Sequence, residues 1–123
     1  MKQNIIRGKR ILVVDDEPSV RKTFRKLLEY DGHAVTEAND GAEALALFTR
    51  GQFDLVTTDF EMPVMKGNEL AVRIKHLAPS QPILMITASE RGFGGSENPV
   101  DSLLEKPFAM ADLRSAIAKL LSN

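Results

Sequence analysis

The chain has 123 residues, of which 43% are hydrophobic and 27% charged, and its 16 basic and 17 acidic side chains leave a net charge of -1. This length and balance predict one globular domain with its own core, and they exclude a disordered chain or two full domains. The near-neutral charge argues against recruitment of nucleic acid or a membrane surface, and the absence of cysteine excludes disulfides and thiolate sites. Apolar runs are too short to span a bilayer and no signal-peptide core precedes them, so we expect a small soluble domain of the cytoplasm.

Residues 1–8 are basic and contain no acid. We expect them to form a solvated N-terminal tail rather than a nucleic-acid-binding arm, because short charged termini are usually frayed. The domain itself should then occupy residues 9–123.

The first predicted element is Ile11–Val14, a continuous branched run typical of a strand buried on both faces. A helix should follow, because Pro18 suits a first helical position and apolar side chains recur after it at helical spacing. This helix should end near Gly32. His33–Glu37 is a second, weaker strand candidate.

The next helix has a clear start signal. Asp40 is a candidate N-cap, and Glu43, three residues later, would complete a capping box. Gly51 should end this helix. Phe53–Thr58 is a third predicted strand, closed by Asp59.

In the second half of the chain, an apolar stripe that starts at Leu70 predicts a helix that must end before Pro79. Ile83–Thr87 is the fourth predicted strand and Leu103–Leu104 a shorter fifth one. Pro107 is predicted to open the final helix.

Ser89–Pro99 interrupts this rhythm at the point where a fourth helix is due. Gly92, Gly94 and Gly95 each cost about 1 kcal/mol relative to alanine in a helix interior. We therefore expect this segment to be short or irregular rather than a full helix.

Alternating strands and helices predict an α/β fold with a parallel sheet and helices on both faces. In such sheets ligands bind beyond the carboxyl ends of the strands. The residues at those ends are mainly polar: Asp15, Asp16, Glu17, Asp59, Thr87 and Lys106. Singly, each has an ordinary explanation as a helix cap, loop acid or solvated charge. These separate explanations do not account for why all six residues fall at the same edge of the sheet.

Three carboxylates at one edge need compensation. Two of them about 4 Å apart repel by roughly 4 kcal/mol at an effective dielectric of about 20. A divalent cation and Lys106 would balance the formal charge, and oxygen-only ligands favour Mg²⁺ over zinc. Such a site could accept a phosphoryl group between metal and ammonium.

Four motifs resemble those of the receiver domain of two-component response regulators. They are Val13-Val14-Asp15-Asp16-Glu17, Asp59-Phe60-Glu61-Met62-Pro63 followed by Gly67, Met85-Ile86-Thr87-Ala88, and Lys106-Pro107-Phe108. The resemblance extends from about Lys9 to the C-terminus. It implies the flavodoxin-like, doubly wound fold with five parallel strands in the order 2-1-3-4-5.

The resemblance also implies a role for each matching residue. Asp59 matches the phosphoacceptor, which takes a phosphoryl group from a phosphohistidine. Asp16 matches a direct Mg²⁺ ligand, Asp15 an acid acting largely through water, and the backbone carbonyl of Glu61 a further ligand beside Asp59.

Two further residues match groups that contact the phosphoryl group. Thr87 matches the hydroxyl that bonds a phosphoryl oxygen and moves in the switch, and Lys106 matches the lysine that pairs with the phosphoryl group. The Lys106-Pro107 peptide bond resembles the family's cis bond.

Three departures concern the output surface rather than the chemistry. Leu103 stands where the family often has an aromatic residue, Lys66 where many members have Asp or Asn, and the segment between Thr87 and Lys106 is about one helical turn short. We therefore hypothesise that output here is an order–disorder change in Ser89–Pro99.

The leading function is thus a phosphoacceptor switch that is not an enzyme on other substrates. Its expected partners are a sensor histidine kinase or histidine phosphotransfer protein and a downstream effector protein, without nucleic acid or membrane, in a monomer or weak dimer. One alternative is a small phosphohydrolase with Asp15 as nucleophile, although Glu17 stands where such enzymes want a second Asp. Another is an interaction module that has lost phosphorylation.

Overall fold

The computed structural model describes residues 5–88 and 99–122. Within them the chain forms five strands and four helices, in the order β1 (Arg10–Val14), α1 (Pro18–Tyr30), β2 (Ala34–Ala38), α2 (Gly41–Arg50), β3 (Leu55–Thr58), α3 (Gly67–Leu77), β4 (Ile83–Thr87), β5 (Ser102–Glu105) and α4 (Met110–Leu121). None of the helices in these described ranges is both long and apolar enough to cross a membrane.

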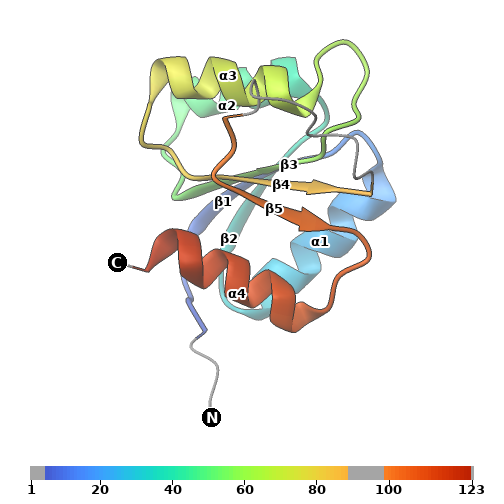
Figure 1. Ribbon diagram of the computed structural model, residues 1–123, viewed down its shortest axis with the longest axis vertical. Helices are drawn as coiled ribbons and strands as arrows, with labels where there is room; N and C mark the ends of the chain where they lie inside the picture. The colour runs from blue at the N-terminus through green and yellow to red at the C-terminus, as the bar shows by residue number, and fades with distance from the viewer. Residues whose placement is uncertain (1–4, 89–98, 123) are drawn as a thin grey trace.

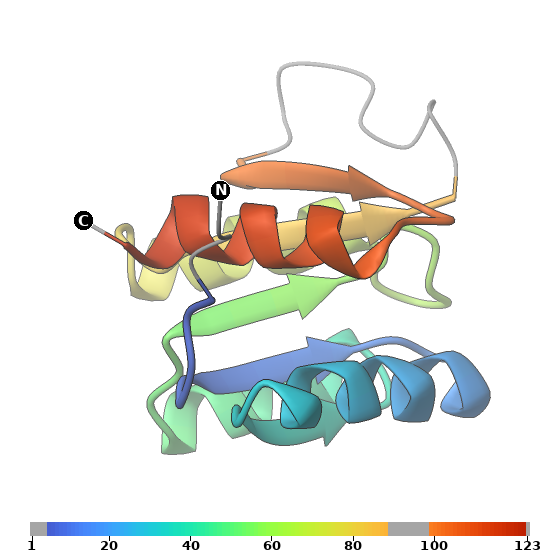
Figure 2. The ribbon, with the colours of Figure 1, turned by 90° about the horizontal axis from the view of Figure 1, so that it is seen from below.

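The strands pair in parallel as one sheet with the order β2-β1-β3-β4-β5. All strand arrows point toward the same edge of the sheet (Figure 2). This confirms both the α/β fold class and the strand order that the resemblance implies. It also brings the residues that follow each strand to a common edge.

Helices cover both faces of the sheet. α2 and α3 lie on one face, and α1 and α4 lie on the other (Figure 1). Each face has its own core, and β1 and β4 contribute side chains to both by alternation along the strand. Burial on two sides therefore explains the continuous apolar runs of β1 and β4, and all four residues of β3 are buried as well.

The predicted strand Ile83–Thr87 is confirmed at both ends, while the other strands differ from prediction by one or two residues. The last helix is the larger correction, because it begins at Met110 and not at Pro107. The side chain of Asp112 accepts a hydrogen bond from the backbone N–H of Ala109 at 3.2 Å, which favours a start after Ala109. Phe108 instead packs its ring edge-on against Phe24 of α1.

The start of α2 follows the prediction with one change. Asp40 is the N-cap, and its carboxylate accepts from the backbone N–H of Glu43 at 2.8 Å. The Glu43 carboxylate accepts from the N–H of Asn39 rather than from Asp40, at 2.6 Å. The cap thus also holds Asn39, the first residue of the β2–α2 connection.

Two sequence predictions concern residues at the margins of the described structure. The irregular segment predicted for Ser89–Pro99 lies outside the described residues, apart from Pro99, and so does the order–disorder hypothesis for it. In the N-terminal tail, Ile6 is half-buried and packs against the core between the sheet and α1 and α4.

Val64, in the β3–α3 loop, has a backbone φ of +72° and a fully exposed side chain. A β-branched residue is strained in this left-handed region, whereas Asn tolerates it. Val64→Asn should therefore stabilise the fold by about 1 kcal/mol in chemical denaturation. The matched control is Val72→Asn, the same change at an exposed position of α3, which should give no gain. Equal changes in unfolding free energy for the two variants would contradict backbone strain at Val64.

Candidate functional site

Three carboxylates gather at the carboxyl edge of the sheet. Asp15 and Asp16 follow β1, Asp59 follows β3, and each offers an oxygen such that the three oxygens lie within 4.8 Å of one another. β1 and β3 are hydrogen-bonded neighbours, with Val14 paired to Thr58, so both chains leave the sheet side by side. The predicted gathering of these acids therefore follows from the strand order.

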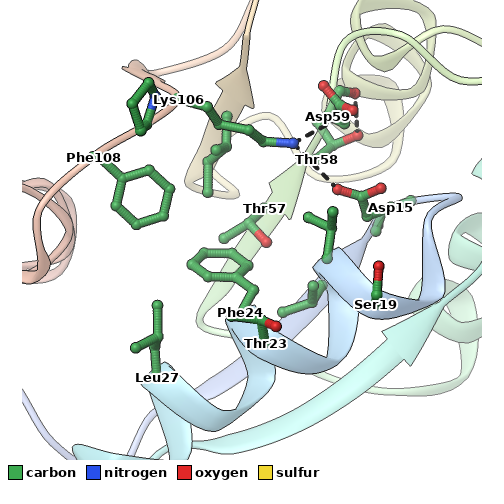
Figure 3. A pocket seen from close by; sticks show the side chains of 15 residues that line it. Asp15, Ser19, Thr23, Phe24, Leu27, Thr57, Thr58, Asp59, Lys106 and Phe108 are labelled. Carbon is green, nitrogen blue, oxygen red and sulfur yellow. Dashed lines mark hydrogen bonds and ion pairs between the residues drawn. The ribbon is translucent and has the colours of Figure 1, made fainter.

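Lys106 lies between two of these acids. Its Nζ is 3.5 Å from Oδ2 of Asp15 and 3.7 Å from Oδ2 of Asp59. Dashed lines mark these two ion pairs in Figure 3. The Lys106 backbone N–H donates to the carbonyl of Thr87 at 2.9 Å, which fixes the start of the β5–α4 loop beside the end of β4. The Lys106-Pro107 peptide bond is cis, as the resemblance implies.

The surrounding backbone holds Asp15 and Asp59 in place. The Asp15 side chain is buried, and its Oδ1 accepts from the N–H of Glu17 at 2.9 Å. Oδ1 of Asp59 accepts from the N–H of Phe60 at 2.7 Å. The hydroxyl of Thr58 donates to the Asp59 carbonyl at 2.9 Å. Both carboxylates are thus oriented by local hydrogen bonds while their second oxygens face Lys106.

Burial raises the pKa of the Asp59 carboxyl above its ordinary value, and the nearby Asp15 carboxylate adds to this rise. Lys106 and the N–H groups of Phe60 and Glu61 act in the opposite direction, because they stabilise the charged form. Apart from this pKa, three carboxylates facing one ammonium leave an excess of negative charge, which a bound cation would relieve.

Thr87 and Glu61 occupy different environments near the cluster. Thr87 ends β4 and is buried. Glu61 has an exposed side chain that pairs with Lys66 at 3.0 Å, and the Lys66 ammonium also lies 5.5 Å from the centre of the Phe60 ring. Lys66 therefore folds back over the β3–α3 loop.

An open pocket of about 470 Å³ begins at this cluster and continues between α1 and the β5–α4 loop (Figure 3). Asp15, Asp59 and Lys106 line one end of it, and Phe24, Leu27 and Phe108 line the other. The charged groups are thus reached from solvent along an apolar wall.

Two residues that shape this site were given no role by the sequence. Gly67 begins α3 directly beneath the Asp59–Phe60 backbone, where an added Cβ would lie 2.1 Å from the Asp59 carbonyl oxygen. Arg21, in the first turns of α1, donates to the carbonyl oxygen of Asp15 at 2.8 Å. Gly67 was at least part of a recognised motif, whereas no local pattern points from Arg21 to Asp15.

Comparisons with known proteins agree with this arrangement. The family model of the response regulator receiver domain matches residues 11–118. A similar curated protein is the response regulator MprA of Mycobacterium leprae, which is 39% identical over 116 residues that cover 91% of this chain and 50% of MprA. The chain therefore spans about half the length of the curated relatives it matches.

Solved structures give the same family. The response regulator TrrA of Thermotoga maritima in complex with Mg²⁺-BeF is 36% identical, covers 92% of this chain and 99% of TrrA, and has a TM-score of 0.88. TrrA in complex with the histidine kinase ThkA has a TM-score of 0.85 at 36% identity, with 93% and 99% of the two chains covered.

These matches favour the first of the three functions weighed from the sequence over the phosphohydrolase and the interaction module. They agree with the fold class and with the strand order of the sheet. The chain belongs to the response regulator receiver domain family, the phosphoacceptor domains of two-component signalling.

Proposed function

We propose that Asp59 is the phosphoacceptor of this chain and that its phosphoryl donor is the phosphohistidine of a sensor histidine kinase or a histidine phosphotransfer protein. The observation that carries the proposal is the position of the Lys106 ammonium, within 3.7 Å of both Asp15 and Asp59. An ammonium held between acids can pair with the charge that a phosphoryl group adds.

In the proposed step, an oxygen of the Asp59 carboxylate attacks the phosphorus. The P–N bond of the phosphohistidine breaks as the P–O bond forms, and its electron pair stays on the imidazole nitrogen. The backbone N–H of Phe60 holds the other Asp59 oxygen at 2.7 Å, so the carboxylate is oriented before attack. Lys106 then pairs with the transferred group, and the Thr87 hydroxyl bonds one of its oxygens.

The donor set suits a magnesium ion. Carboxylate oxygens of Asp15, Asp16 and Asp59 come within 4.8 Å of one another, and hard oxygen ligands are those that Mg²⁺ prefers. We propose Asp16 and Asp59 as direct ligands, Asp15 as a ligand acting through water, and the backbone carbonyl of Glu61 as a further ligand. When bound, the ion would neutralise phosphoryl charge during transfer.

The remaining proposals concern the domain as a whole. We propose that residues 9–123 form the receiver domain after a tail of residues 1–8, and that the only reactions it catalyses are its own phosphorylation and dephosphorylation. Its output would pass to an effector protein in the cytoplasm, with the receiver as a monomer or weak dimer.

Phosphorylation should require Mg²⁺, and Asp16→Ala should weaken Mg²⁺ binding more than Asp15→Ala does. The reason is that a direct ligand contributes more than one acting through water. Isothermal titration with Mg²⁺ gives the affinities, and intact mass after incubation with a small phosphodonor, with and without EDTA, gives the modification.

In the absence of metal, Asp16→Ala should melt at or above the temperature of the unaltered chain, because it removes one charge from a repelling cluster. Asp15→Ala should gain less, because it also loses the bond from the Glu17 N–H and the pairing with Lys106. Equal Mg²⁺ affinity in all three proteins would contradict this metal site. Phosphoryl gain in EDTA would contradict the metal requirement.

A further inference from the structure

Arg21 makes three side-chain hydrogen bonds to three different segments. Its NH1 donates to the backbone carbonyl of Asp15 at 2.8 Å and to the Oδ1 of Asn39 at 3.2 Å. Its Nε donates to a carboxylate oxygen of Glu37 at 2.7 Å. The guanidinium therefore joins the β1–α1 loop to β2 and to the β2–α2 connection.

Burial and charge both help to hold the Arg21 guanidinium in this position. The side chains of Arg21 and Glu37 are only 12% and 13% exposed, so their ion pair is largely shielded from solvent. A planar guanidinium offers its donors in a fixed fork, and hydrogen bonds from it to a carbonyl or carboxylate are charge-assisted. The position of the Asp15 carbonyl is accordingly set by β2.

The Asp15 carbonyl matters because it belongs to the peptide unit that joins Asp15 to Asp16. A peptide unit is planar, so holding its oxygen restrains the plane that contains the Cα atoms of both residues, and with it the points from which their side chains project. Both side chains belong to the acidic cluster. Within the described residues Arg21 forms no hydrogen bond to either carboxylate, but it holds the backbone from which both project.

We propose that Arg21 is a positioning residue of the magnesium site, which orients Asp15 and Asp16 through the peptide unit between them. This inference rests on the proposed function, because it assumes that these acids bind Mg²⁺. A purely structural role would instead make Arg21 a contributor to stability with no effect on Mg²⁺ affinity.

Arg25 provides a matched control. It lies one helical turn further along α1, and its NH1 pairs with the other oxygen of Glu37 at 2.9 Å. Arg25→Met therefore removes the same charge from the same Glu37 but leaves the bond to Asp15 intact. Loss of a cation near three carboxylates should by itself tighten Mg²⁺ binding slightly, in both variants. A positioning role instead predicts weaker Mg²⁺ binding, and only for the Arg21 variant.

The test is Mg²⁺ titration by calorimetry of the unaltered chain, Arg21→Met, Arg21→Lys and Arg25→Met, with melting curves in EDTA as a check on folding. Arg21→Met should weaken Mg²⁺ binding by about tenfold, as is typical when a residue that orients a metal ligand is removed. Arg21→Lys should remain weakened, because a single ammonium does not reproduce the fork. Arg25→Met should bind Mg²⁺ as tightly as the unaltered chain or slightly more tightly.

Arg21→Met affinity equal to or tighter than that of the unaltered chain would overturn the inference, as would equal weakening in Arg21→Met and Arg25→Met. If Arg21→Met does not fold, Arg21→Lys carries the same comparison with Arg25→Met. Failure of the unaltered chain to bind Mg²⁺ is a separate result, which would overturn the proposed function and this inference with it.

Discussion

Asp59→Asn should abolish covalent phosphorylation of the chain. The amide keeps the size and shape of the side chain but lacks the negative oxygen that attacks phosphorus. The measurement is intact mass after incubation with a small phosphodonor at saturating Mg²⁺, so that a weaker metal site does not account for the loss.

The matched control for Asp59→Asn is Asp54→Asn, the same change on the residue that precedes β3 instead of the one that follows it. Asp54 accepts a hydrogen bond from the backbone N–H of Arg10 at 2.8 Å and is at the opposite edge of the sheet. This variant should gain the phosphoryl group like the unaltered chain. A phosphoryl gain by Asp59→Asn would show that another residue is the acceptor.

Gly67→Ala should be among the most destabilising single substitutions in the described part of the chain. A Cβ at this position would lie 2.1 Å from the carbonyl oxygen of Asp59 and 3.0 Å from the Cα of Phe60. These are backbone atoms that cannot rotate away, and the N–H of Gly67 already donates to the Phe60 carbonyl at 2.9 Å. The start of α3 and the end of β3 would have to separate, at a cost of about 3 kcal/mol or more.

The same displacement would move Asp59 relative to Lys106, so phosphorylation should slow as well as stability fall. Gly51→Ala is the control, because a Cβ there would meet its nearest neighbour, a ring atom of Phe53, at an ordinary 3.4 Å. Chemical denaturation of both variants gives the difference in unfolding free energy. Similar unfolding free energies for Gly67→Ala and Gly51→Ala would show that the Asp59–Phe60 backbone can move away from α3 at little cost.

The sequence by itself determined most of the secondary structure. Ile83–Thr87 was predicted to its ends because a continuous apolar run that begins after Pro82 and ends in a β-branched threonine is a local signal of a buried strand. Asp40 was predicted as an N-cap for a similar local reason, since its bond spans only three residues. The expectation that acids meet at one edge needed only the parallel direction of the strands.

The tertiary structure decided the contacts that join segments distant in the chain. The final helix starts at Met110 for one local reason, the bond from the Ala109 N–H to Asp112, and one distant reason. The distant reason is that Phe108 packs on Phe24 of α1, a partner that no pattern near Pro107 indicates. The order of the strands is likewise absent from their periodicity, and came only from the resemblance. Arg21 reaches Asp15, and Gly67 passes under Asp59, through the way α1 and α3 pack on the sheet. Local propensity acts over a few residues, whereas these contacts depend on the packing of whole elements, so they arise only when the chain has folded.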